Sequence, residues 1–163
     1  QIQDALDTVE DILQNCPKST DIVLFPINIK DYTLLKHLYN RGRYSIISHW
    51  EFVDVLTQIP KNAIDRVYIS WWGNRVNEFH GKDAIIHPYA CDNCHTKLMQ
   101  FYNSFVNVSS LEDKQKAVET ISKVSCSCRI AYEKEKATQK CKKTISQRLS
   151  DEIEKLETEF IRT

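Results

Sequence analysis

The sequence predicts an all-α fold, a bundle of about six to seven helices stapled by disulfides. Apolar residues recur at spacings of three and four along most of the chain, which is the period of one helix face. The 163 residues include only three glycines and four prolines, too few for the many tight turns of a β-sandwich or barrel. The six cysteines are an even number, which is typical of disulfide-linked domains.

The N-terminal part of the chain predicts two helices separated by an extended segment. Residues 1–16 carry their apolar side chains on one face, and Pro17 ends this helix. Residues 21–29 are a short apolar run, and its internal proline favours an extended segment or an edge strand. Asp31 is the expected N-cap of the next helix, which ends at residues 40–42.

Two further helices are expected before residue 80. Ser48 and Glu51 have the spacing of a capping box, so they predict the start of a helix that ends at Pro60. Asn62 then opens a second helix, whose apolar positions continue to Phe79.

The C-terminal half predicts a loop followed by three helices. Residues 80–90 are the expected loop, and the apolar positions from Cys94 to Phe105 repeat at helical spacing. Ser110 is the expected N-cap of the next helix. Residues 129–161 carry an apolar stripe over about nine turns, so we expect one long amphipathic helix there.

We expect residues 1–163 to form a single helical ectodomain fragment of a longer protein. The chain begins at Gln1, inside the first predicted helix, and shows neither an initiator methionine nor a signal peptide. No stretch approaches the ~20 apolar residues that span a bilayer, so we expect no direct membrane insertion in this segment. The 22 basic and 22 acidic residues give a formal net charge of zero, which argues against nucleic acid as a partner.

The main site candidates are the cysteines, and the preferred interpretation is three disulfides. They are Cys16, Cys91, Cys94, Cys126, Cys128 and Cys141. The two cysteines of a CxC pair rarely bond to each other, so Cys126 and Cys128 are expected to pair with Cys91 and Cys94. Cys16 and Cys141 lie on apolar helix faces and remain as the third pair by elimination, closing a loop of about 125 residues.

A zinc site is the alternative interpretation of four of these cysteines. Cys91 and Cys94 form a CxxC half-site, followed by His95, and Cys126 and Cys128 supply a second pair. A structural zinc needs four nitrogen or sulfur ligands in a tetrahedron. Because CxC is an unusual ligand pair, we prefer the disulfides and expect no metal and no cofactor. The alternative would make the chain an intracellular zinc-stabilised helical interaction domain.

Residues 91–95 also spell CxxCH, the attachment motif of c-type haem. Met99 lies one turn after His95 on the same segment and cannot reach the opposite face of a haem, so His80 or His87 would have to bind there. We rank a haem protein third.

The triplet Asn107-Val108-Ser109 is a glycosylation sequon in a predicted polar turn. We therefore expect Asn107 to be exposed and glycosylated. Together with the paired cysteines, the sequon favours the secretory pathway and a location outside the cell, on a virion or on a cell surface.

No motif in the chain predicts catalysis. The five histidines include no HExxH, and neither a phosphate loop nor a nucleophile elbow is present, so we expect that the protein is not an enzyme. Trp50, Trp71 and Trp72 fall among apolar neighbours at helical spacing, and at least two of them are expected to be buried.

The pattern Ser125-Cys126-Ser127-Cys128 with Cys141, after a long helical region that contains Cys16, resembles the membrane-distal head of the orthobunyavirus envelope glycoprotein Gc. The resemblance covers roughly residues 10–145. It implies a virion-surface domain without enzymatic activity, which projects from the spike and is exposed to antibodies. The expected function is thus an exoplasmic binding or shielding module, and the resemblance implies the exposed head domain of a viral envelope glycoprotein, involved in host-cell attachment and antibody recognition. Its expected partners are a protein or cell-surface receptor and the remainder of the parent glycoprotein.

Overall fold

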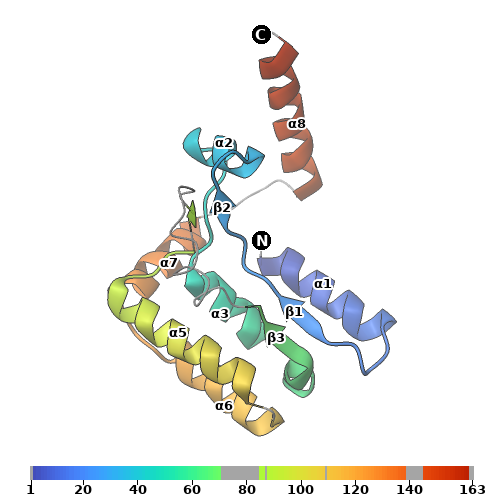
Figure 1. Ribbon diagram of the computed structural model, residues 1–163, viewed down its shortest axis with the longest axis vertical. Coiled ribbons are helices and arrows are strands. Elements are labelled where there is room, and N and C mark those ends of the chain that lie inside the picture. The colour runs from blue at the N-terminus through green and yellow to red at the C-terminus, as the bar shows by residue number, and fades with distance from the viewer. Residues whose placement is uncertain (1, 71–84, 87, 109, 139–144, 162–163) are drawn as a thin grey trace. The chain divides into compact units, whose positions relative to one another are not determined.

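The computed structural model describes residues 2–70, 85–86, 88–108, 110–138 and 145–161 (Figure 1). Helices account for most of these residues, which confirms the predicted helical fold. The described part also contains four short strands and no disulfide, so an all-α, disulfide-stapled bundle was too narrow a prediction. The elements in chain order are α1 (Ile2–Asn15), β1 (Ile22–Leu24), β2 (Ile29–Lys30), α2 (Leu34–Asn40), α3 (His49–Gln58), the 3-10 helix η1 (Lys61–Arg66), β3 (Val67–Ile69), β4 (Ile85–Ile86), α5 (Asp92–Asn107), α6 (Leu111–Ser122), α7 (Ser127–Thr138) and α8 (Ile145–Ile161).

Hydroxyl side chains cap three of the helices. The Oγ of Ser48 accepts a hydrogen bond from the Trp50 N–H at 3.2 Å, and Ser110 caps α6 in the same way, as the sequence predicted. The predicted cap at Asp31 is wrong, because Thr33 caps α2. Asp31 instead forms an ion pair with Lys36, with Nζ and Oδ1 3.1 Å apart.

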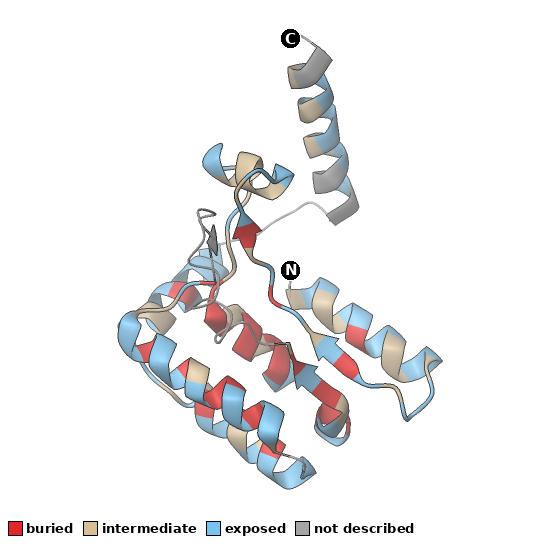
Figure 2. Ribbon diagram, in the orientation of Figure 1, coloured by how far each residue is buried: buried red, intermediate tan, exposed pale blue. Residues whose placement is uncertain are grey.

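The hydrophobic core lies around α3, which packs against α1 and α6, while α5 packs against α6 and β3. Figure 2 shows the buried positions concentrated on α3, α5 and α6. Three helix residues at its centre, Val53, Leu98 and Phe105, are fully buried. These residues belong to the apolar stripes that predicted the helices.

The predicted helix from Asn62 to Phe79 is confirmed only as far as Arg66, where the chain is a 3-10 helix, and is wrong over Val67–Ile69. The chain forms η1 and then turns into β3, which pairs in parallel with β1, so that Val23 lies beside Tyr68. Branched and aromatic side chains alternate buried, exposed and buried along β3, and such side chains suit a half-buried strand. Residues 71–79, with Trp71 and Trp72, lie outside the described part of the chain.

Part of the expected loop over residues 80–90 is also a strand. β4 pairs antiparallel with β2, and Tyr89 then forms a bridge with Ser48. The carbonyl oxygen of Tyr89 accepts a hydrogen bond from the His49 N–H at 3.1 Å. This bridge fixes the chain that leads into α5 beside the first turn of α3.

The segment predicted as one long helix, residues 129–161, is helical over its described parts, which belong to α7 and α8. Residues 139–144 between them lie outside the description. The chain divides into two units, Gln1–Tyr132 and Glu133–Thr163, and a single domain over residues 1–163 stays a prediction. None of the described helices combines the length and apolar character needed to cross a membrane.

Candidate metal centre

Four cysteine side chains from two parts of the chain meet at one point. The Sγ atoms of Cys91, Cys94, Cys126 and Cys128 all lie within 4.8 Å of one another, and those of Cys91 and Cys126 are 3.4 Å apart. A zinc–sulfur bond of 2.3 Å places the sulfurs of a tetrahedral site roughly 3.8 Å apart. The four sulfur atoms therefore have the chemistry and the spacing of ligands to one metal ion.

Cys91 and Cys94 are positioned by the first turn of α5. Cys91 is the N-cap of this helix and has an extended backbone, and its carbonyl oxygen accepts the His95 N–H at 2.7 Å. Cys94, three residues later, lies on the same side of the turn and is only 1% exposed. A CxxC pair that spans a helix start in this way directs both sulfurs to one point.

Cys126 and Cys128 occupy the equivalent place at the start of α7. The carbonyl oxygen of Cys126 accepts the Ile130 N–H at 3.0 Å, so Cys126 directly precedes the helix and Cys128 lies in its first turn. The N-termini of α5 and α7 thus meet at the thiol cluster. The free N–H groups and the positive dipole end of a helix N-terminus stabilise thiolates.

Burial and local hydrogen bonds lower the pKa of both cysteines at α7 and raise the pKa of both cysteines at α5. The backbone N–H of Cys128 and the thiols of Cys94 and Cys91 lower the pKa of Cys126 to about 6. Burial raises the pKa of Cys128, but the backbone N–H of Cys91 and the indole of Trp50 outweigh it, so that this pKa is lowered. Burial raises the pKa of Cys94. The backbone N–H of Cys94 lowers the pKa of Cys91, but the thiols of Cys126 and Cys128 raise it above its ordinary value.

Trp50 contacts the cluster, and Arg129 lies against Trp50. The Nε1–H of Trp50, a residue only 1% exposed, donates to the Sγ of Cys128 at 3.2 Å. The Arg129 guanidinium lies 5.1 Å from the centre of the Trp50 ring and donates to the carbonyl oxygens of Ser122 and Val124.

The structure corrects the predicted disulfides. None of the described cysteines is bonded to another, and the 3.4 Å between Cys91 and Cys126 exceeds the ~2.05 Å of an S–S bond. Since the disulfides supported the extracellular interpretation, the disulfide-bonded extracellular description of this chain is also corrected. Cys16 is a free, half-buried thiol, and its predicted partner, Cys141, lies outside the described residues.

Asn107 and His95 are not among the four clustered ligands. Asn107 is exposed, as expected of a glycan acceptor, and its side-chain Nδ2 donates to the Asn103 carbonyl at 2.7 Å; its glycosylation stays a prediction. His95 is exposed, and His80 and His87, the expected second haem ligands, lie outside the described residues.

Sequence reasoning missed the roles of two residues at the start of α3. Trp50 was expected only to be buried, and its bond to Cys128 joins residues 78 positions apart. His49 is buried next to it, and its Nδ1 lies 3.1 Å from the hydroxyl of Tyr102, whose pKa is raised by burial. Helix and strand periodicity relates only residues that are close in sequence. It therefore could not predict the Trp50–Cys128 or the His49–Tyr102 contact.

The resemblance to the Gc head domain rested on the Cys126–Cys128 pair together with Cys16 and Cys141. The structure places the first two in the thiol cluster and leaves the resemblance a prediction, as it does host-cell attachment and the viral surface location. Comparison of the chain with protein-family models, curated proteins and solved structures finds no match in any of the three.

Proposed function

We propose that this chain is a zinc-stabilised helical interaction domain in which Cys91, Cys94, Cys126 and Cys128 hold one structural Zn²⁺. The convergence of the four Sγ atoms within 4.8 Å of one another carries the proposal. Four thiolates complete the tetrahedral shell of zinc, which leaves no open position for water or substrate. The ion would cross-link the starts of α5 and α7, and the proposal gives it no catalytic step.

A single zinc ion fits this cluster better than an iron–sulfur cluster. Sulfur-only donor sets bind either zinc or iron–sulfur centres. A cluster of several irons separates its cysteine ligands more widely than one ion does, whereas here two sulfurs are 3.4 Å apart. Such a set of reduced thiolates persists in a reducing compartment, so the proposal includes an intracellular setting.

The exposed face of the β1–β3 sheet supports a role in protein binding. Val23 and its register neighbour Tyr68 are 60% and 38% exposed, and Ile27, just beyond β1, is 50% exposed. Parallel strands are usually covered on both faces. The proposed work of the domain is therefore to present a folded surface to a protein partner.

Metal analysis of the purified full-length chain tests the zinc site. The protein is prepared under reducing conditions and analysed by native mass spectrometry and elemental analysis, and we expect one zinc per chain. Cobalt substitution should give the thiolate-to-cobalt absorption band in the near ultraviolet and a tetrahedral d–d spectrum.

Single serine variants identify the ligands. Cys91→Ser and Cys126→Ser should each lose zinc, because each removes one of four sulfur donors. Cys16→Ser is the matched control, since this thiol is free and outside the cluster, and it should keep one zinc. Iron in place of zinc, or a metal-free protein with unchanged folding, would overturn the proposed site.

A further inference from the structure

The first half of α7, residues 127–132, is attached to the rest of the unit Gln1–Tyr132 with little hydrophobic support. Of the twelve residues of α7, only Tyr132 is buried, and Ile130, in the first turn, is 52% exposed. Helices shorter than ~12–15 residues are marginally stable in water on their own. The helix therefore depends on specific contacts to stay docked.

Two hydrogen bonds, one turn apart, connect α3 to α7. Trp50 Nε1 donates to Cys128 Sγ at 3.2 Å, and the Tyr132 hydroxyl donates to Asp54 Oδ2 at 2.8 Å. Because both contacts advance by four residues on each helix, the two helices run side by side in the same direction. The first of these bonds is accepted by the Sγ of Cys128, which is also a proposed metal ligand. Metal binding and the docking of α7 therefore share this sulfur atom.

We propose that metal occupancy controls the docking of α7, an inference that rests on the proposed zinc site. With zinc bound, Cys126 and Cys128 hold the first turn of α7 against α5, and Trp50 and Asp54 keep it on α3. When zinc leaves, the remaining contacts of Cys128, Arg129 and Tyr132 are too weak to hold the helix, and α7 detaches and unwinds. Of the buried residues that form the described core, only Tyr132 belongs to α7, so the core around Val53 stays folded.

Hydrogen–deuterium exchange of the full chain, with and without zinc, tests the inference. Zinc is removed with a chelator in the presence of a reductant that keeps the thiols reduced. We expect the amides of residues 130–138 to exchange faster by on the order of a hundredfold or more in the zinc-free protein. Peptides from α3, α6 and the middle of α5 should keep their protection.

Trp50→Phe tests separately whether the hydrogen bond to Cys128 Sγ supports metal binding. Phenylalanine keeps an aromatic ring in the core but lacks the N–H that bonds to Cys128. Loss of such a second partner typically weakens metal binding by 10–100-fold, so we expect at least about a tenfold loss of zinc affinity against a competing chelator. Phe52→Leu, a core change on the same helix, controls for altered packing and should keep its zinc affinity.

The outcomes separate this inference from the zinc site. Zinc bound at one per chain, with α7 still protected after its removal, would overturn the inference and leave the site intact. Exchange that rises equally in α7 and in the core would also overturn it, because zinc would then stabilise the whole unit. A chain that binds no zinc would overturn both.

Discussion

Replacing Lys114 with methionine is expected to destabilise the protein by about 2–3 kcal/mol. Lys114 lies on α6 and is 2% exposed. Its Nζ donates to the carbonyl oxygens of Asp65 and Val67, both at 2.9 Å, and lies 4.3 Å from the centre of the Tyr68 ring. One ammonium group thus joins α6 to the point where η1 becomes β3.

The magnitude follows from these contacts. A hydrogen bond to a charged donor contributes about 1.5–3 kcal/mol, and a desolvated cation–π contact adds about 1–2 kcal/mol. Methionine removes these interactions, together with a weaker cation–π contact to Phe105 at 5.2 Å, but it also removes the cost of burying an ammonium, which is several kcal/mol. After this offset, the net loss of stability is about 2–3 kcal/mol. It lowers the thermal unfolding midpoint by roughly 5–10 °C for a chain of this size.

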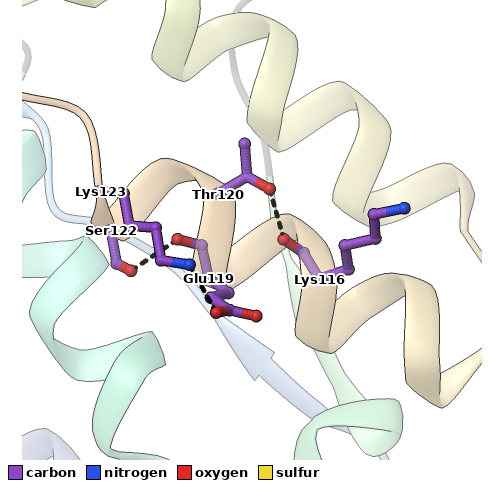
Figure 3. A network of polar contacts seen from close by, with 5 residues as sticks. All are labelled: Lys116, Glu119, Thr120, Ser122 and Lys123. Atoms are coloured by element: carbon purple, nitrogen blue, oxygen red, sulfur yellow. Dashed lines mark hydrogen bonds and ion pairs between the residues drawn. The ribbon is translucent and has the colours of Figure 1, made fainter.

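Urea unfolding monitored by circular dichroism, on zinc-loaded protein, measures the loss. Lys116→Met is the matched control, because Lys116 is exposed on the same helix. Figure 3 shows its side chain directed away from the Glu119–Lys123 pair. A Lys114→Met variant as stable as this control would refute the reasoning that the buried ammonium fixes the η1–β3 junction.

The pH dependence gives a second measure of the same group. Burial lowers the pKa of Lys114, although Asp65 and Asp21 act in the opposite direction. The unfolded chain therefore binds more protons at this residue than the folded one, between the lowered pKa and the ordinary value of 10.5. Stability from this group rises with pH across that window, and Lys114→Met should remove the rise.

The remaining predictions concern the core and the surface. Tyr102→Phe removes the hydroxyl that lies 3.1 Å from Nδ1 of His49 at a buried site, and should cost about 1–2 kcal/mol in urea unfolding; an unchanged midpoint would argue against that bond. Phe105→Ala removes a ring with no exposed surface and should cost about 3–5 kcal/mol by the same assay. Glu119→Gln removes an ion pair with Lys123 in which both side chains are more than half exposed, and the thermal midpoint should not move; a clear drop would contradict this.

The helices could be predicted because their signals are local. Hydroxyl caps at Ser48 and Ser110 and apolar residues at helical spacing are all contained in a short stretch of chain. β3 was missed because Val67 and Tyr68 continue the spacing of the preceding turn, and three residues are too few to distinguish a strand from a helix by period. The deciding partner, β1, lies more than 40 residues earlier in the sequence.

Sequence analysis identified the four cysteines of the candidate site, but it preferred disulfides to a metal site. Disulfides and a tetrathiolate metal site both require Cys91 and Cys94 to approach Cys126 and Cys128, so the sequence spacing alone could not choose between them. The CxC pair was discounted as an unusual ligand pair, and the structure supplies the reason that it can serve. Cys126 precedes α7 and Cys128 lies in its first turn, and the two sulfurs come together at this helix start. The short spacing is thus compatible with one metal ion because a helix begins between the two cysteines.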